Sequence, residues 1–233
     1  MGIETKQDQV VVKSLWGDAW RTLRRNRAAM TGALLMAIIL LAVTVGPWLS
    51  QYAYDFTDWP NTSIGPSLGT GHFFGTDTLG RDLFVRTLYG GRISLLVGVV
   101  ASVVSLLIGI SYGATAGYFG GRLDAIMMRF VDILYAMPFM FFVILLMVFF
   151  GRNILMIFLA IGAINWLDMA RIVRGQTLSL KQREFVEAAQ AQGVGTLAIL
   201  VRHIVPNLLG VVAIYITLTI PQVILVESFL SFL

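Results

Sequence analysis

The sequence predicts an all-α membrane protein, a polytopic bundle of transmembrane helices. Of its 233 residues, 57% are hydrophobic and 13% are charged, whereas soluble domains carry about 25% charged residues. Several apolar stretches are close to the roughly 20 residues that a helix needs to cross the hydrocarbon core. The chain contains no cysteine, which excludes disulfides and thiolate metal sites.

Five stretches are expected to cross the membrane. They follow a polar segment, residues 1–27, and the first is separated from the second by a loop, residues 50–92, that holds several acidic and basic side chains. Two of the later stretches contain charges, and one contains Pro138, which removes a backbone hydrogen bond within a helix. Small residues in "GATAG" favour close packing between helices. The expected spans are residues 28–49, 93–121, 126–150, 153–170 and 204–226.

The distribution of basic residues predicts the orientation. Cytoplasmic loops carry an excess of lysine and arginine, and with the N-terminus inside, the two sides of the chain differ strongly. The outer side holds Arg81, Arg86, Arg92 and Arg152. The inner side holds Lys6, Lys13, Arg21, Arg24, Arg25, Arg27, Arg122, Arg171, Arg174, Lys181, Arg183 and Arg202. We therefore expect a cytoplasmic N-terminus, an external loop at 50–92 and a cytoplasmic loop at about 172–205.

Two pairs of opposite charges lie within or at the ends of the expected spans. Arg129 and Asp132 are three residues apart, as are Asp168 and Arg171. Side chains at this spacing share one face of a helix, so each pair is expected to form a local ion pair near the cytoplasmic end of its span. Five spans place the end of the chain outside. Because the sequence stops in "ESFLSFL" without a polar tail, a sixth helix is expected to be missing.

The segment "REFVEAAQAQGVGTLAILVRHIVPN", residues 183–207, differs from the apolar runs around it. Its first part has high helix propensity, and Gly193 and Gly195 then favour a sharp turn. A more apolar helix follows, and Pro206 suits the first turn of the next span. A loop that rests on the membrane surface accounts for this composition equally well.

The order of these residues resembles a known signature. "EAA", three further residues, Gly193 and then Pro206 are similar to the cytoplasmic loop of permease subunits of bacterial ABC importers, although Val205 stands where that family usually has leucine. In that family the loop forms a coupling helix that docks into an ATP-binding subunit. The resemblance implies that the ATPase-coupling residues are Glu184, Glu187, Ala188, Ala189, Gly193 and Pro206.

A second segment, "FGTDTLGRDLFVRTLYGGRISLLVG", resembles the sequence before the second span in permeases of the peptide and nickel group. Residue chemistry alone favours a capped external loop, with Thr76 and Asp77 as turn or N-cap residues and with Arg81, Asp82 and Arg86 as a surface charge cluster. From about residue 14 to its end, the chain is most similar to the second inner-membrane subunit of oligopeptide permeases. This implies residues 93–233 as a permease core, in a fold of the ABC importer permease type.

The resemblance also implies partners. A homologous second permease would complete the path, two cytoplasmic subunits would bind ATP and Mg²⁺, and an extracytoplasmic protein would deliver peptide in the bacterial inner membrane. The chain has no G-x-x-x-x-G-K-[ST] loop, so no cofactor, metal or catalytic site is expected in it, and lipid rather than nucleic acid is the expected surroundings. Glu227 is expected either to contact a peptide amine or the gate, or to be an ordinary interfacial carboxylate.

Two alternatives remain open. The group signature is shared by dipeptide and nickel importers, so the substrate class is not unique. A self-sufficient secondary transporter is the alternative from another class, and it should show ionisable residues near the middle of the membrane and an inverted repeat. The expected charges lie at the span ends and no internal repeat is visible, which favours the importer subunit.

Overall fold

The computed structural model describes residues 15–151 and 154–232, and in these ranges the regular structure is helical. The expected segment at residues 1–14 and the external Arg152 lie outside this part. The chain divides into two compact units, one ending at Arg92 and the other beginning at Ile93. The predicted all-α class is therefore confirmed for the described residues.

The first unit contains two helices and an irregular loop that follows them. Helix α1 (Leu15–Arg25) is followed by α2 (Arg27–Leu49), and Asn26 between them caps α2 by accepting a hydrogen bond from the Ala29 amide (3.2 Å). At 1.5 Å per residue, α2 is about 35 Å long, enough to cross a membrane. A 3₁₀ turn (Trp59–Asn61) interrupts the loop that follows.

Arg92 ties α2 to the start of the next helix. Its Nε donates to the Val43 carbonyl (3.0 Å) and its Nη2 donates to the Thr44 carbonyl (2.9 Å). Close by, a Cβ added at Gly46 would come within 2.6 Å of the Leu88 side chain. The end of α2 thus has a defined contact although most of its surface is exposed.

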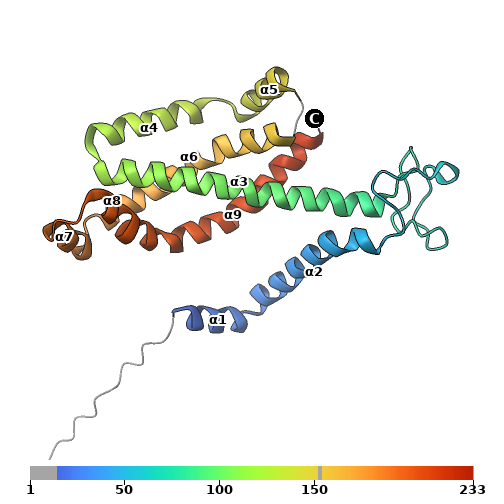
Figure 1. The fold of residues 1–233 in the computed structure, drawn as a ribbon, viewed down its shortest axis with the longest axis horizontal. Coiled ribbons are helices and arrows are strands. Elements are labelled where there is room, and N and C mark those ends of the chain that lie inside the picture. Colours follow the sequence, from blue (N-terminus) through green and yellow to red (C-terminus); the bar gives the residue numbers. More distant parts are fainter. Residues whose placement is uncertain (1–14, 152–153, 233) are drawn as a thin grey trace, which may run out of the picture. The chain divides into compact units, whose positions relative to one another are not determined.

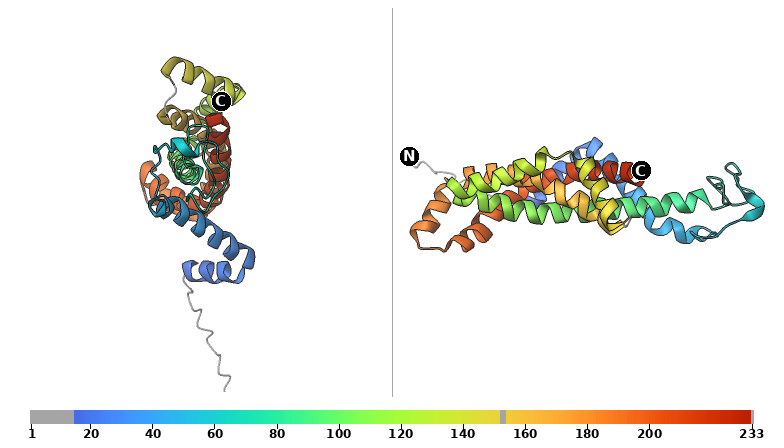
Figure 2. Two further views of the ribbon diagram at one scale, coloured as in Figure 1. Left: turned by 90° about the vertical axis from the view of Figure 1, so that its right-hand side faces the viewer. Right: turned by 90° about the horizontal axis from the view of Figure 1, so that it is seen from above.

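The second unit is a bundle of long helices (Figures 1 and 2). Helix α3 (Leu83–Phe119) follows the loop in the sequence, and α4 (Gly121–Ala136), α5 (Phe139–Phe150) and α6 (Ile154–Leu180) come after it. Helices α4, α5 and α9 all contact α6, which makes α6 the central helix of the unit. The remaining elements are α7 (Glu184–Ala191), α8 (Thr196–Ile199), a π-helical stretch (Leu200–Ile204) and α9 (Val205–Phe232).

Helices α3 and α6 approach each other at a row of glycines. Gly109, Gly113 and Gly117 are four residues apart and therefore share one face of α3. An added Cβ would lie 2.4 Å from a Met169 side-chain atom at Gly109, 2.4 Å from the Ala170 carbonyl oxygen at Gly113 and 2.8 Å from the Arg174 carbonyl oxygen at Gly117. The small residues of "GATAG" thus allow nearly backbone-to-backbone packing.

The expected third span is wrong as a single helix. Met137 and Pro138 have extended backbones (ψ 131° and 117°), so the chain forms α4 and α5 instead. The physical reason is local: the proline ring disfavours the helical conformation of the preceding residue, and its nitrogen donates no hydrogen bond.

Two other helices extend beyond the expected spans. The second span was expected from residue 93, but α3 begins at Leu83, and α6 continues past Ala170 to Leu180. In the part of the chain that the structure describes, three helical stretches have the length and composition of membrane spans: Arg27–Leu49, Leu83–Phe119 and Thr196–Ser231. Helices α4 and α5 are individually short, and α6 carries charges along its second half.

Alanine substitutions at a closely packed glycine and at an unpacked one should affect the stability of the protein differently. Gly113→Ala should destabilise the protein by about 1–3 kcal/mol because the new methyl group meets the α6 backbone and forces the helices apart. Gly210→Ala in α9 meets no atom within 4 Å and should be neutral or stabilising, since alanine favours helix over glycine. Thermal unfolding in detergent measures both. An equal Tm for the two variants would contradict the assigned packing.

Candidate functional site

The "EAA" signature segment forms a helical elbow, which we define as residues 184–204. Its first arm, α7, ends in a turn that requires glycine. Gly193 has a φ of +77°, its amide donates to the Gln190 carbonyl (2.9 Å), and the Val194 amide donates to the Ala189 carbonyl (3.1 Å). These two bonds are those of a Schellman motif. Nothing lies within 4 Å of a Cβ placed on Gly193, so backbone conformation, rather than space, explains the glycine.

The inner face of the elbow is part of the bundle core. Val186 and Ala189 of α7 are 0% and 6% exposed. They share one apolar cluster with the second arm of the elbow and with α3, α6 and α9. The other buried members are Ala114, Met169, Val173, Ile199, Leu200, Ile204, Leu208 and Val212. The elbow is therefore packed onto the long helices and cannot shift without disturbing their core.

The outer face of the elbow carries both charge and apolar surface. Glu184, Glu187 and Ala188 are exposed, and so are Phe185 (40%) and Leu197 (74%). We call these five residues the outer face. Neither glutamate forms an ion pair with another described residue. Charged and large apolar side chains on one small surface are typical of a protein contact.

A hollow opens beside the outer face. It is lined by Leu180, Gln182, Arg183, Glu184, Phe185 and Asn207. It thus combines the end of α6, the start of α7 and the start of α9.

The expected coupling residues differ in where they lie and in how exposed they are. Glu184, Glu187 and Ala188 lie on the outer face, and Gly193 forms the turn. Ala189 is buried in the apolar cluster, where a larger side chain would not fit without rearrangement. Pro206 lies in the first turn of α9 and is exposed.

The second arm joins α9 without a loop. Between α8 and α9 the hydrogen-bond pattern widens, so that the Val205 amide donates to Leu200, five residues earlier. Such π-helical turns occur mostly as short insertions within α-helices, frequently at functional sites. Pro206 follows directly, and because it has no amide hydrogen it leaves no donor unpaired where the pattern changes. The predicted second, more apolar helix is thus continuous with the last span.

Tyr118 at the end of α3 accepts hydrogen bonds from residues near the two ends of α7. Its carbonyl accepts a hydrogen bond from Lys181 Nζ (3.1 Å), and its hydroxyl accepts one from Gln190 Nε2 (3.2 Å). Lys181 lies between α6 and α7, and Gln190 lies in the last turn of α7. Sequence reasoning missed Tyr118 because a tyrosine at the end of an apolar helix gives no local signal of a contact more than sixty residues away.

Both expected local ion pairs are wrong. Asp132 of α4 pairs with Arg171 of α6 (2.8 Å) and not with Arg129, and Arg171 does not pair with Asp168. A local pair at this spacing contributes only about 0.2–0.5 kcal/mol, so the approach of a neighbouring helix readily decides the partner. A second pair links the same helices: Arg174 Nε and Nη2 donate to the two carboxylate oxygens of Asp124 (2.5 and 2.6 Å).

Glu227 is buried between α3 and α9. It is 6% exposed and accepts hydrogen bonds from Ser94 Oγ of α3 (2.7 Å) and from Ser231 Oγ of its own helix (2.7 Å). Its carboxylate therefore links α3 to α9. This role as a link between two helices was not expected from the sequence.

The loop between α2 and α3 folds around a buried histidine. His72 is fully buried and stacks on the Tyr52 ring, with centroids 4.0 Å apart. Its Nδ1 lies 2.7 Å from Asp82 Oδ2, and its Nε2 lies 3.4 Å from Asp58 Oδ2. Hydrogen bonding from Asn61 is the largest of the effects that lower the pKa of Asp58.

The expected surface charge cluster is wrong for Asp82, which is 3% exposed and caps α3 through the Val85 amide (2.8 Å). Asp77 is a turn residue as predicted, because it accepts hydrogen bonds from the amides of Leu79 and Arg81 (both 2.9 Å). The hydrogen bond from the Arg81 amide is the main reason that the pKa of Asp77 is lowered. Thr76 is buried, and its hydroxyl accepts from the Ile64 amide (3.1 Å).

Comparison with known proteins gives matches over nearly the whole chain. The family described as binding-protein-dependent transport system inner membrane component matches residues 109–233, and the N-terminal TM domain of oligopeptide transport permease C matches residues 14–66. The oligopeptide transport system permease protein OppC of Escherichia coli strain K12 is 58% identical over 97% of this chain and 74% of its own length.

Two further relatives have the same description. The OppC protein of Haemophilus influenzae is 56% identical over 97% of this chain and 72% of its own length. That of Bacillus subtilis is 47% identical over 94% of this chain and 72% of its own length. The resemblance to ABC importer permeases is thereby confirmed, and the chain belongs to the family of binding-protein-dependent transport system inner membrane components.

Proposed function

We propose that the chain is the membrane-spanning permease subunit of an ATP-driven importer for oligopeptides. It forms half of the translocation path and couples to separate ATP-binding subunits. The observation that carries this proposal is the elbow, whose inner face is locked into the core while its outer face presents Glu184, Glu187 and exposed apolar side chains. Another protein that binds the outer face can therefore displace the elbow, and the shared core transmits this displacement to the spans.

The substrate class is supported by the relatives. Three bacterial proteins described as oligopeptide permeases are 47–58% identical to this chain, whereas a dipeptide permease of Bacillus subtilis is 45% identical and a glutathione permease of Escherichia coli is 38% identical. The ranking favours oligopeptides over dipeptides by a small margin and over glutathione by a larger one.

The proposed assembly contains four kinds of subunit. A homologous permease supplies the other half of the path, two cytoplasmic subunits bind ATP and Mg²⁺, and an extracytoplasmic protein delivers the peptide. The complex lies in the bacterial inner membrane, with the N-terminus of this chain and its elbow in the cytosol, as the excess of basic residues on that side supports.

Mechanically, nucleotide-driven closure of the ATP-binding subunits moves the elbow. Because the elbow shares one apolar cluster with α6 and α9, its displacement carries both helices with it. Tyr118 passes the motion to α3, and the pair between Asp124 and Arg174 passes it to α4. Transport then follows from two states of the complex whose relative free energy depends on bound nucleotide.

The direct experiment is peptide uptake by the full complex reconstituted in liposomes. Uptake of a labelled tripeptide should require ATP, the binding protein and both ATP-binding subunits. A secondary transporter would instead take up peptide with a proton gradient and no ATP. Uptake driven by the gradient alone would refute the proposal.

The outer face should tolerate no reversal of charge. Glu187→Lys is expected to lower ATP-dependent uptake at least tenfold while leaving membrane insertion intact, because it replaces an exposed carboxylate at the proposed contact with the ATP-binding subunits. The matched control is Ser179→Lys, which adds a positive charge at an exposed position of α6 outside the outer face. Uptake by Glu187→Lys equal to that of the control, at matched expression, would count against a coupling role.

The turn of the elbow allows a sharper comparison between two glycines. Gly193→Ala should cost about 1 kcal/mol because alanine resists a φ of +77°. Gly195→Ala should cost little, since that residue has a φ of −63° and nothing lies within 4 Å of its added Cβ. The first variant should lower the amount of peptide imported per ATP hydrolysed, because a loosened α7 transmits less motion. Identical coupling ratios would show that the turn is not required.

A further inference from the structure

Helices α4 and α6 present a polar patch formed by Asp132, Tyr135 and Arg171. The Arg171 guanidinium donates to Asp132 Oδ1 (2.8 Å) and lies over the Tyr135 ring, 4.3 Å from its centroid. Tyr135 itself is half exposed. The patch therefore brings a carboxylate, a guanidinium group and a tyrosine ring together on the surface of the chain.

The patch differs from the other ion pair between the same helices. The side chains of Asp132 and Arg171 are 57% and 38% exposed, whereas that of Asp124 is 11% exposed and is bound by two nitrogens of Arg174. The pair at Asp124 is thus a closed structural link. Asp132 and Arg171 share a single hydrogen bond. The second carboxylate oxygen of Asp132 and the other N–H groups of Arg171 are therefore open to a further partner.

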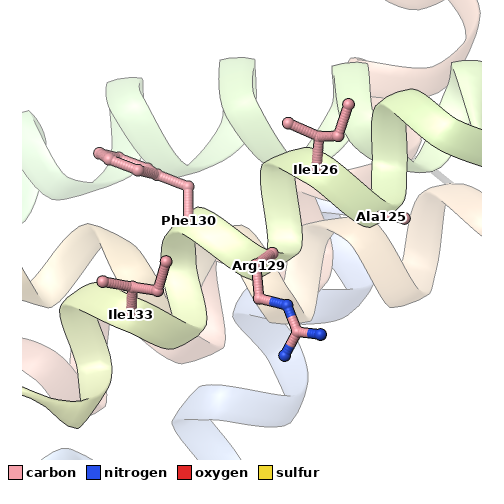
Figure 3. Close-up of a pocket in the computed structure, with 5 residues that line it drawn as sticks. All are labelled: Ala125, Ile126, Arg129, Phe130 and Ile133. Atoms are coloured by element: carbon pink, nitrogen blue, oxygen red, sulfur yellow. The ribbon is translucent and has the colours of Figure 1, made fainter.

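Two more charges flank the patch. Asp168 lies one turn before Arg171 on α6, is half buried, and forms no ion pair with the described residues. Arg129 lies one turn before Asp132 on α4 and is also without an ion pair in the described part of the chain. Figure 3 shows the Arg129 guanidinium group on the opposite side of α4 from the side chains of Ile126, Phe130 and Ile133. These three residues line an apolar hollow to which Arg129 also contributes. The surface thus offers two carboxylates and two guanidinium groups.

Such a surface is unlike one that faces lipid or an obligate subunit interface. Charged side chains on membrane helices are costly against acyl chains and almost always face the interior of a bundle or a water-filled cavity. The cores of permanent protein interfaces are depleted in charged residues. An open ion pair with a tyrosine and two further charges is typical of a wet surface that exchanges its partners.

We propose that this surface faces the translocation path and binds the charged ends of the peptide. The ammonium group of the peptide would be bound by Asp132 and Asp168, and its carboxylate by Arg171 and Arg129. Recognition of the ends does not depend on the side chains between them, which suits a path for peptides of varied sequence. The inference rests on the proposed function, since it names residues of this chain that contact the proposed substrate.

The test captures a peptide during transport by the complete complex. A photoreactive benzophenone amino acid is placed at Ala136, which is exposed one turn after Asp132 on the same face of α4. The control position is Phe130, which is half exposed and about 200° around the helix from Asp132. With a radiolabelled tripeptide, ATP and the binding protein, illumination should attach at least fivefold more label at position 136 than at position 130.

A second comparison separates binding from structure. The double variant Asp132→Asn with Arg171→Gln keeps polar groups that link α4 to α6 but removes both charges, and it should reduce capture at position 136 at least fivefold per assembled complex. The matched variant Asp77→Asn with Arg81→Gln removes an ion pair of the loop between α2 and α3 (2.8 Å), and it should leave the capture per assembled complex unchanged.

Three outcomes would overturn the inference. These are equal capture at positions 136 and 130, equal loss of capture in the two double variants, and attachment of position 136 to the second permease in place of the peptide. If the complex imports peptide but position 136 captures none, only this inference fails. If the complex imports no peptide, the proposed function fails with it.

Discussion

The elbow and its proposed role depend on one packing constraint, the burial of Val186 and Ala189 in the core that α6 and α9 share. These two side chains are on the inner face of an eight-residue helix that would have little stability alone, since isolated helices of this length are marginal in water. Burial against the long helices fixes its position. The same burial leaves Glu184, Glu187 and Ala188 facing outward, so that one short helix is both anchored and accessible.

The elbow was predictable because its determinants are local. The alanine- and glutamate-rich run predicts a helix, Gly193 predicts its end, and both are where the sequence places them. The glycines of "GATAG" likewise predicted close packing of α3. In contrast, the break at Met137 and Pro138 goes beyond the loss of one backbone hydrogen bond that the proline predicts within a single span.

The contacts that sequence reasoning missed are all non-local. Asp132 has a basic residue three positions away on its own helix, yet it pairs with a residue on another helix, and nothing in the spacing reveals the choice. Tyr118, Asp124 and His72 give no pattern that distinguishes them from ordinary residues. Their roles depend on which helices or turns become neighbours, and that is decided by the summed packing of the bundle and of the external loop. Ala189 illustrates the same limit, since its motif predicts a helix but not which of its two alanines is buried.

The most direct measurement of the central claim is the accessibility of Ala188. Because the chain contains no cysteine, Ala188→Cys provides a single exposed thiol on the outer face of the elbow. We expect an impermeant thiol reagent to label it in inside-out membrane vesicles stripped of ATP-binding subunits, and we expect labelling to be blocked when those subunits are added back. Labelling from the outside of intact cells, or labelling in stripped vesicles that the added subunits leave unchanged, would contradict the claim that the elbow is the cytosolic contact of the ATP-binding subunits.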